Sequence, residues 1–421
     1  MDRIIVRSFI AVIMFGVLLF FIQLDSTLYR KSIVASADIS GPIVNDQSKM
    51  QRIRREDNFF QIAGTEIFLF SAYLDMRFSS GSLHLIGMQQ QHESRSLKCH
   101  LVFPMTTVSV EYSFKAAIYP LWPSEKLKYY AFLFHFKSVI LPLHSVSLTS
   151  NIYAKCWADN FNQTTNIPVT VVHKKTQRQI VTPPSLAVCV KAVYGQINAS
   201  KLIEWMEFNR LLGIQKFVFY DAAVIGSAIN VLQYYQTEGI VDIVPFTYLL
   251  KMQTLMQDDP MKDKLLSSTL LLEQGHLVSI NDCMYHYANH YDYIAVVDVD
   301  EIIIPHGDPT LRALVSRAEK YHPYVAAYSF ETAWHYESFG ASQSNNPSLL
   351  HTQQFRRRTA PMKSQPKSIM KTDYFLSGIR LLLCVLNQQL LAIIIYHQRS
   401  MDSHIISDHP VNIFHINVRF F

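Results

Sequence analysis

Residues 293–301 read Tyr-Ile-Ala-Val-Val-Asp-Val-Asp-Glu, an apolar run that ends abruptly in three carboxylates. A short apolar run followed by acid predicts a buried strand that presents charge at the rim of a sheet. Side chains at i and i+2 of an extended chain point to the same side, so Asp298 and Asp300 are expected to lie together. The alternative is that a strand-ending aspartate only caps the following turn.

Two carboxylates at this spacing suit Mg²⁺ or Mn²⁺, which proteins bind through one or two carboxylates while substrate phosphates complete the coordination shell. The pair therefore predicts a phosphorylated ligand. The residues that follow, Ile302–Pro305, are apolar again, so Glu301 stands between two hydrophobic stretches. A charge in such a setting seldom lacks a partner.

The N-terminus predicts a membrane anchor. Residues 8–24 are uncharged and almost wholly apolar, and Arg3 and Arg7 precede them. Their length is near the lower limit of roughly 17–25 residues for a spanning helix. The basic flank predicts a single-pass type II signal-anchor, with residues 1–7 as a cytoplasmic tail. A signal peptide cleaved near Ala35-Ser-Ala37 is the alternative, and both place the rest of the chain in the Golgi or another secretory lumen.

Composition describes a globular protein with ample core. The chain has 421 residues, 49% of them hydrophobic and 12% aromatic, with a net charge of +5. That charge is too small for a nucleic-acid-binding surface. Two sequons, Asn162-Gln-Thr164 and Asn198-Ala-Ser200, are candidate glycosylation sites and agree with a luminal location.

Five cysteines lie too far apart for a CxxC metal site, and in an oxidising lumen disulfides are their natural assignment. The sequence does not fix the pairing. Cys99 with Cys156 and Cys189 with Cys283 would each lie within one region, which leaves Cys384 over. Alternatively, all five are small buried apolar residues.

The rhythm of the chain changes twice after the anchor. Residues 25–58 are polar and mixed, as in a luminal stem. Residues 59–182 carry short apolar or alternating runs broken by Pro, Ser and Asn, which predicts a small β-rich region. From residue 183 onward strands and helices alternate, which predicts an α/β fold with a mainly parallel sheet and helices on both faces. The expected strands are 186–190, 216–220, 240–244, 293–297 and an extended segment at 325–336, and the expected helices are 199–212, 230–237, 271–290 and 310–321.

Ligands of such sheets collect beyond the carboxyl ends of the strands. Asp221 and the acidic cluster both follow strands in this way. The sequence contains neither GxGxxG nor GxxxxGK[ST], so a dinucleotide site or a P-loop lacks support. A metal and side chains are therefore expected to hold the phosphates.

Several short motifs, in this order along the chain, resemble glycosyltransferase family 92. They are Cys189-Val-Lys191, Tyr194-Gly195, Glu204–Gly213, Phe217–Asp221, Gln233–Tyr235, Glu238-Gly239, Asn281–Cys283, Tyr293–Pro305 and Pro366–Ser368. The resemblance runs from about residue 185 to 372, within an expected domain of residues 183–372. It implies a GT-A-like fold, an inverting β-galactosyltransferase, UDP-galactose as donor, a divalent cation, Mn²⁺ above all, and a glycan or glycoprotein acceptor.

The resemblance also assigns roles on the donor side. Asp298 and Asp300 would meet the nucleotide and the metal, with Asp300 the better candidate for direct ligation. Asp221 would touch the base or ribose, although a turn-capping role is an equal alternative. Lys367 would contact a phosphate, where the alternative is a solvated loop lysine.

An inverting transfer needs a base for the acceptor hydroxyl. Glu331 and Asp373 are the candidates, with Glu337 and His335 as further options, and the sequence does not choose among them. Residues 373–421 depart from the family pattern, so this segment is atypical and activity depends on it. The alternative functions are a catalytically inactive glycan-binding homologue and a metal-dependent phosphohydrolase.

Overall fold

The structure is a computed structural model. It describes residues 58–77, 81–93, 96–103, 110–112, 117–120, 127–139, 152–173, 184–266, 269–305, 307–322, 325–335, 339, 350, 352, 359–360, 362–374 and 415–417. The predicted tail, anchor and almost all of the stem lie outside these residues, as do Glu337 and Cys384. Within the described ranges, no helix is both long and apolar enough to span a membrane.

A mixed sheet organises the C-terminal half of the described chain. Its order is β12-β11-β10-β13-β15-β14-β16. The strands are β10 (Leu186–Gln196), β11 (Lys216–Ile225), β12 (Val241–Pro245), β13 (Tyr293–Val297), β14 (Ala327–Thr332), β15 (Met362–Lys371) and β16 (His415–Asn417). β10 to β13 pair in parallel, whereas β15 runs antiparallel to both of its neighbours. The predicted α/β class is confirmed.

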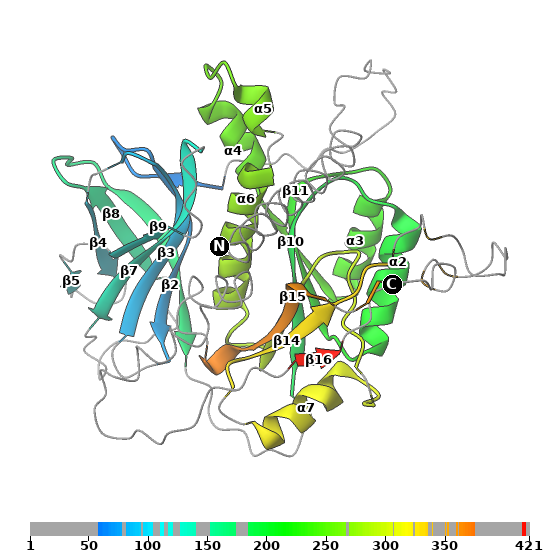
Figure 1. The fold of residues 1–421 in the computed structure, drawn as a ribbon. Coiled ribbons are helices and arrows are strands. Elements are labelled where there is room, and N and C mark those ends of the chain that lie inside the picture. The colour runs from blue at the N-terminus through cyan, green and yellow to red at the C-terminus, as the bar shows by residue number, and fades with distance from the viewer. Residues whose placement is uncertain are drawn as a thin grey trace, which may run out of the picture.

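Helices cover both faces of this sheet (Figure 1). α2 (Ala199–Leu211), α3 (Ala228–Thr237) and α7 (Leu311–Tyr321) pack on one face, and α6 (Thr269–His286) packs on the other, near α4 (Tyr248–Leu255) and α5 (Lys262–Leu266). The alternation along β10 explains this arrangement. Val188 and Val190 face the core of α2, while Ala187 and Cys189 face the core of α6. Because residues 186–190 of β10 are buried on both faces, their sequence is a continuous apolar run.

The termini of α2 show how local sequence sets a helix. Asn198 precedes the helix, and its side-chain oxygen accepts a hydrogen bond from the backbone N–H of Lys201 at 3.1 Å. This contact satisfies one of the N–H groups that the first turn leaves without a partner. The helix ends before Gly213, whose φ of +95° is a conformation that glycine adopts without strain.

A second sheet precedes the first along the chain and has the order β5-β4-β8-β9-β2-β3-β7-β6, with β1 added beside β2. Its strands are β1 (Phe60–Gln61), β2 (Ile67–Met76), β3 (Gly81–Gln90), β4 (Leu97–Val102), β5 (Val110–Tyr112), β6 (Ala117–Pro120), β7 (Tyr129–Val139), β8 (Tyr153–Ala158) and β9 (Thr165–His173). α6 lies between the two sheets (Figure 1). Residues of both sheets and of α6 share one hydrophobic core, so the two regions are not packed independently.

Four elements of the α/β sheet and its helices were not expected from the sequence, and β16 (His415–Asn417) is one of them. α4 and α5 were not expected, and β15 was not expected as a strand because Pro366 interrupts it. Proline has no N–H to donate to a ladder. The β14–β15 register shifts after the Phe330–Lys367 pair and resumes at Thr332–Met362, so Pro366 falls within the irregular stretch.

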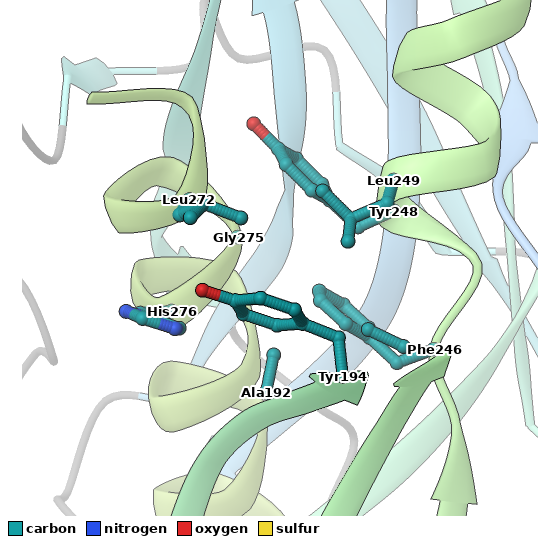
Figure 2. Close-up of a pocket in the computed structure, with 9 residues that line it drawn as sticks. Ala192, Tyr194, Phe246, Tyr248, Leu249, Leu272, Gly275 and His276 are labelled. Atoms are coloured by element: carbon teal, nitrogen blue, oxygen red, sulfur yellow. The ribbon is translucent and has the colours of Figure 1, made fainter. Parts of the chain in front are cut away.

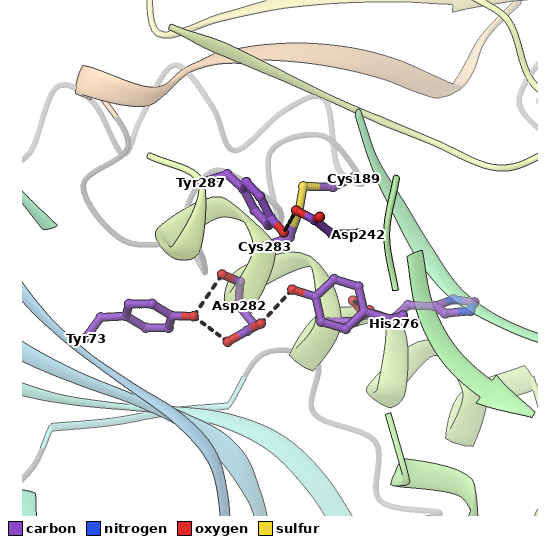
Figure 3. The surroundings of a disulfide bond; sticks show 9 residues. Tyr73, Cys189, Asp242, His276, Asp282, Cys283 and Tyr287 are labelled. Atoms are coloured by element: carbon purple, nitrogen blue, oxygen red, sulfur yellow. Dashed lines mark hydrogen bonds between the residues drawn. A yellow bond between two sulfur atoms is a disulfide. The ribbon is translucent and has the colours of Figure 1, made fainter. Parts of the chain in front are cut away.

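Two disulfides join the pairs that the sequence left open. Cys99 and Cys156 lie directly opposite each other on β4 and β8 and are bonded. Cys189 on β10 is bonded to Cys283 on α6 (Figure 3). The second bond fixes β10, an inner strand of the α/β sheet, to the helix that the two sheets share. Asn162 is exposed in the turn between β8 and β9, and Asn198 is exposed at the start of α2.

A buried carboxylate joins the two sheets through α6. Asp282 is only 6% exposed, and it accepts hydrogen bonds from the hydroxyls of Tyr73 on β2 (2.5 Å; Figure 3) and Tyr220 on β11 (2.6 Å). Burial and the charge of Asp282 raise the pKa of both tyrosines. Both hydroxyls therefore stay protonated and donate to the carboxylate.

We expect Tyr73→Phe to lower the free energy of unfolding by about 1.5–3 kcal/mol, because it removes a hydrogen bond to a charged buried group. Urea unfolding of the purified protein measures this change. Tyr248→Phe is the matched control, because its hydroxyl is equally buried and has no hydrogen-bond partner among the described residues. Equal losses in the two variants would contradict the role given to Asp282.

Candidate active site

The pairing register brings two lysines to the end of β13. Val190 pairs with Val297 on one side of this strand, and Ser368 pairs with Val296 on the other. Lys191 and Lys367 therefore flank the position at which the acidic cluster begins. Their Nζ atoms lie 3.2 and 3.5 Å from the same oxygen, Oδ2 of Asp298.

Glu301 folds back onto the strand end. Its Oε2 accepts a hydrogen bond from the backbone N–H of Asp298 at 2.9 Å, and its Oε1 lies 2.6 Å from Nζ of Lys367. The indole N–H of Trp205 on α2 donates a hydrogen bond to the backbone carbonyl of Glu301 at 2.7 Å. Glu301 is 8% exposed, so the charge expected between apolar stretches is buried and paired.

The charges of the cluster push the carboxyl pKa values apart. Burial alone would raise the pKa of Asp298, but Lys191 and Lys367 outweigh it and lower that pKa to about 2. Burial, followed by the charge of Asp298, raises the pKa of Glu301 to about 7, and the two lysines limit the rise. Perturbed carboxyls grouped at a strand end are typical of functional sites.

Asp300 is the outward member of the cluster and is exposed. Loss of part of its hydration and the like charge of Asp298 raise its pKa. A cation relieves such repulsion, so the residues present fit a divalent ion. Within the described residues no group of three His, Cys, Asp or Glu side chains could hold a metal. An ion bound at Asp300 would therefore need ligands besides these side chains.

A pocket opens beside this cluster, at the carboxyl ends of β10 and β11. Figure 2 shows the rings of Tyr194, Phe246 and Tyr248 gathered opposite Gly275 of α6, with His276 one residue farther along the helix. The charge of His276 is among those that lower the pKa of Asp298. The cavity has a volume of about 10 Å³, close to the ~10–15 Å³ that one water needs. In this form the pocket is too small for a nucleobase or a sugar ring.

Asp221 lies at the end of the β11–β12 pairing and is buried. Its Oδ1 accepts a hydrogen bond from the backbone N–H of Val224 at 2.9 Å. This local contact is the one that a turn-capping aspartate makes. The structure thus gives Asp221 a structural contact at the edge of the sheet where ligands are expected.

The structure separates the two candidate bases. Glu331 follows Phe330, which pairs with Lys367, so Glu331 lies at the same edge of the sheet as the cluster. Asp373 lies beyond Lys371, which pairs with Tyr293 at the opposite end of β13. The strand between these ends spans roughly 13 Å. The structure does not bring Asp373 to the cluster.

Sequence reasoning assigned no role to Lys191. A signal was present, because Lys191 directly follows the buried run Leu186–Val190, just as Asp298 follows Tyr293–Val297. The sequence pattern does not show which strands are neighbours in the sheet. Only the pairing of β10 with β13 shows that the two strand ends are neighbours.

The comparison with protein families gives a match over the same part of the chain. Residues 185–379 match the model of glycosyltransferase family 92. The match covers a little under half of the chain and includes α2, α6, the acidic cluster and both lysines. It supports the resemblance to this family over that part of the chain.

Two curated proteins of Caenorhabditis elegans are similar to the chain. A β-1,4-galactosyltransferase, galt-1, is 22% identical over 33% of this chain and 31% of its own length. The glycosyltransferase family 92 protein F13G3.3 is 20% identical over 35% of this chain and 28% of its own length. The match therefore spans about a third of the length of these relatives.

Among solved structures, amylomaltase from Corynebacterium glutamicum matches with a TM-score of 0.16 at 9% identity. The match covers 35% of this chain and 20% of that protein. A similarity this small carries no inference about fold or function.

The raised pKa of Glu301 predicts a pH dependence. A carboxyl whose pKa rises from 4.5 to about 7 on folding stabilises the fold below pH 4.5, and this contribution is lost as pH rises towards 7. We expect the free energy of unfolding to fall between pH 5 and 7.5 more steeply in the wild type than in Glu301→Gln. Denaturant unfolding at the two pH values measures the difference.

Asp298→Asn is the companion variant. It removes the neighbouring charge but not the burial that raises the pKa of Glu301, so its pH slope should fall between the other two. Identical slopes in all three proteins would rule out the titration of Glu301.

Proposed function

We propose that the protein is a metal-dependent glycosyltransferase of the GT-A type, which moves galactose from UDP-galactose onto a glycan acceptor with inversion. The observation that carries this proposal is the carboxylate–lysine cluster at the carboxyl end of β13, within the region that matches the family. Carboxylates can hold a cation and ammonium groups can bind phosphate, and a nucleotide diphosphate can use both.

The donor end of the reaction belongs to Asp298, Asp300 and Lys367. Asp300, and Asp298 beside it, would hold the cation, and Lys367 contacts phosphate oxygens. A divalent cation bound there, Mn²⁺ above all, would neutralise the charge that develops on the leaving UDP. Glu301 holds Lys367 in position through its 2.6 Å ion pair.

Inversion is a single displacement at the anomeric carbon. The acceptor oxygen forms a bond to that carbon while the bond from the carbon to the diphosphate oxygen breaks, and UDP leaves with the electron pair. A base takes the proton of the acceptor hydroxyl. We assign this role to Glu331, since its position on β14 at the cluster edge of the sheet supports it.

The two disulfides support a location in an oxidising compartment, since such bonds persist in the secretory pathway. We propose a luminal enzyme held in the membrane by residues 8–24. The exposed sequons at Asn162 and Asn198 are compatible with glycosylation in that lumen.

The test is UDP-galactose turnover with Mn²⁺, measured as UDP release and as transfer to a panel of glycans. Asp300→Ala is expected to lower turnover roughly a hundredfold or more, because it removes a ligand of the cation that stabilises the leaving group. Asp263→Ala is the control, since it removes an exposed carboxylate of α5 remote from the cluster in sequence and should leave turnover unchanged.

Other results identify the alternatives. Equal turnover by the wild type and Asp300→Ala would contradict the role of the cation. Glycan binding without donor turnover would identify a catalytically inactive glycan-binding homologue. Cleavage of phosphoesters without binding of any UDP-sugar would identify a phosphohydrolase.

A further inference from the structure

Two ammonium groups converge on one carboxylate oxygen at the end of β13. We propose that Lys191, together with Lys367, binds the diphosphate of a nucleotide donor, and that Asp298 holds both lysines in place until the nucleotide arrives. This inference rests on the function proposed above and adds Lys191 to its binding residues.

Strand order makes the convergence possible. Lys191 extends from β10 and Lys367 from β15, which are the two neighbours of β13 in the sheet. Their side chains are only 22% and 11% exposed, although lysines usually extend their charged ends into water. Both ammonium groups are therefore held at the rim of the sheet, where ligands of such folds bind.

The contacts of the two lysines differ in length. Lys367 lies 2.6 Å from Glu301, within the usual range for a charge-assisted hydrogen bond. Its distance to Asp298 is 3.5 Å, and that of Lys191 is 3.2 Å. An ammonium has three N–H donors, and in the described structure Lys191 uses one, toward Asp298. Lys191 thus has donors left for an incoming anion.

The chemistry of the anion follows from the pair. Two cations that share one oxygen are matched best by a group rich in oxygen and in negative charge, and phosphates bind lysine ammonium groups as point charges. A diphosphate supplies an oxygen to each lysine at once. Lys191 would therefore act on the phosphates of the donor and not on its nucleoside.

The test compares the affinities of the full-length protein for UDP and for uridine by isothermal titration calorimetry. Lys191→Met should weaken UDP binding roughly ten- to a hundredfold and leave uridine binding within about twofold of wild type. Lys191→Arg should keep part of the UDP affinity, because a guanidinium also donates to phosphate.

Lys216→Met is the matched control. Lys216 is a similarly buried lysine (14% exposed) paired with Asp242 at 2.6 Å, but it lies at the amino end of β11, away from the cluster. Its replacement should leave both affinities unchanged.

Unchanged UDP affinity in Lys191→Met would overturn the role of Lys191 and leave the proposed donor standing. An equal loss of affinity for UDP and for uridine would overturn it too, because such a loss indicates a structural role for Lys191. Absence of UDP binding by the wild type would overturn this inference and the proposed donor together. A loss confined to UDP would support it.

Discussion

α6 is the element on which both sheets depend, because its residues 277–285 are buried on every side. A helix on the surface of a protein buries only one apolar face. In α6, by contrast, every residue from 277 to 285 is buried. Its polar side chains must therefore find partners within the protein. Gln274 accepts from the backbone N–H of Ala131 at 2.7 Å, and Asp282 accepts from two tyrosine hydroxyls. These contacts fix the rotation of the helix, and with it the positions of both sheets.

The same constraint extends to the acidic cluster. Cys283 of α6 is bonded to Cys189, which lies two residues before Lys191 on β10. Glu273 and His276, which lie on either side of Gln274 in the sequence, add charge near Lys191 and Asp298 respectively. The cluster thus combines a strand register, which sets where its charges lie, with a helix whose rotation is fixed by buried hydrogen bonds.

Sequence reasoning predicted the elements whose signals are local. The apolar run 293–297 forms β13 with the predicted bounds, and α2 begins at the residue after Asn198. It missed β15, where a central proline hid the strand, and it left Asp373 among the candidate bases. It could not identify Lys191, because strand order depends on contacts between residues far apart in the chain. The acidic half of the cluster was therefore predictable from the sequence, whereas the basic half was only partly so.

The bond between Cys189 and Cys283 has a consequence for the unfolded chain. The two cysteines are 94 residues apart, and the loop between them contains β10 beyond Cys189, β11, β12 and helices α2 to α5. Closing a loop of this length removes conformational entropy from the unfolded state worth about 4–5 kcal/mol in the chain-entropy account. β11, β12 and most of β10 therefore unfold within a covalent ring, whereas the chain that carries β13, β14 and β15 is released as a linear segment. Oxidation of this cysteine pair therefore restricts the unfolded chain of one part of a continuous sheet and leaves the unfolded chain of the other part unrestricted.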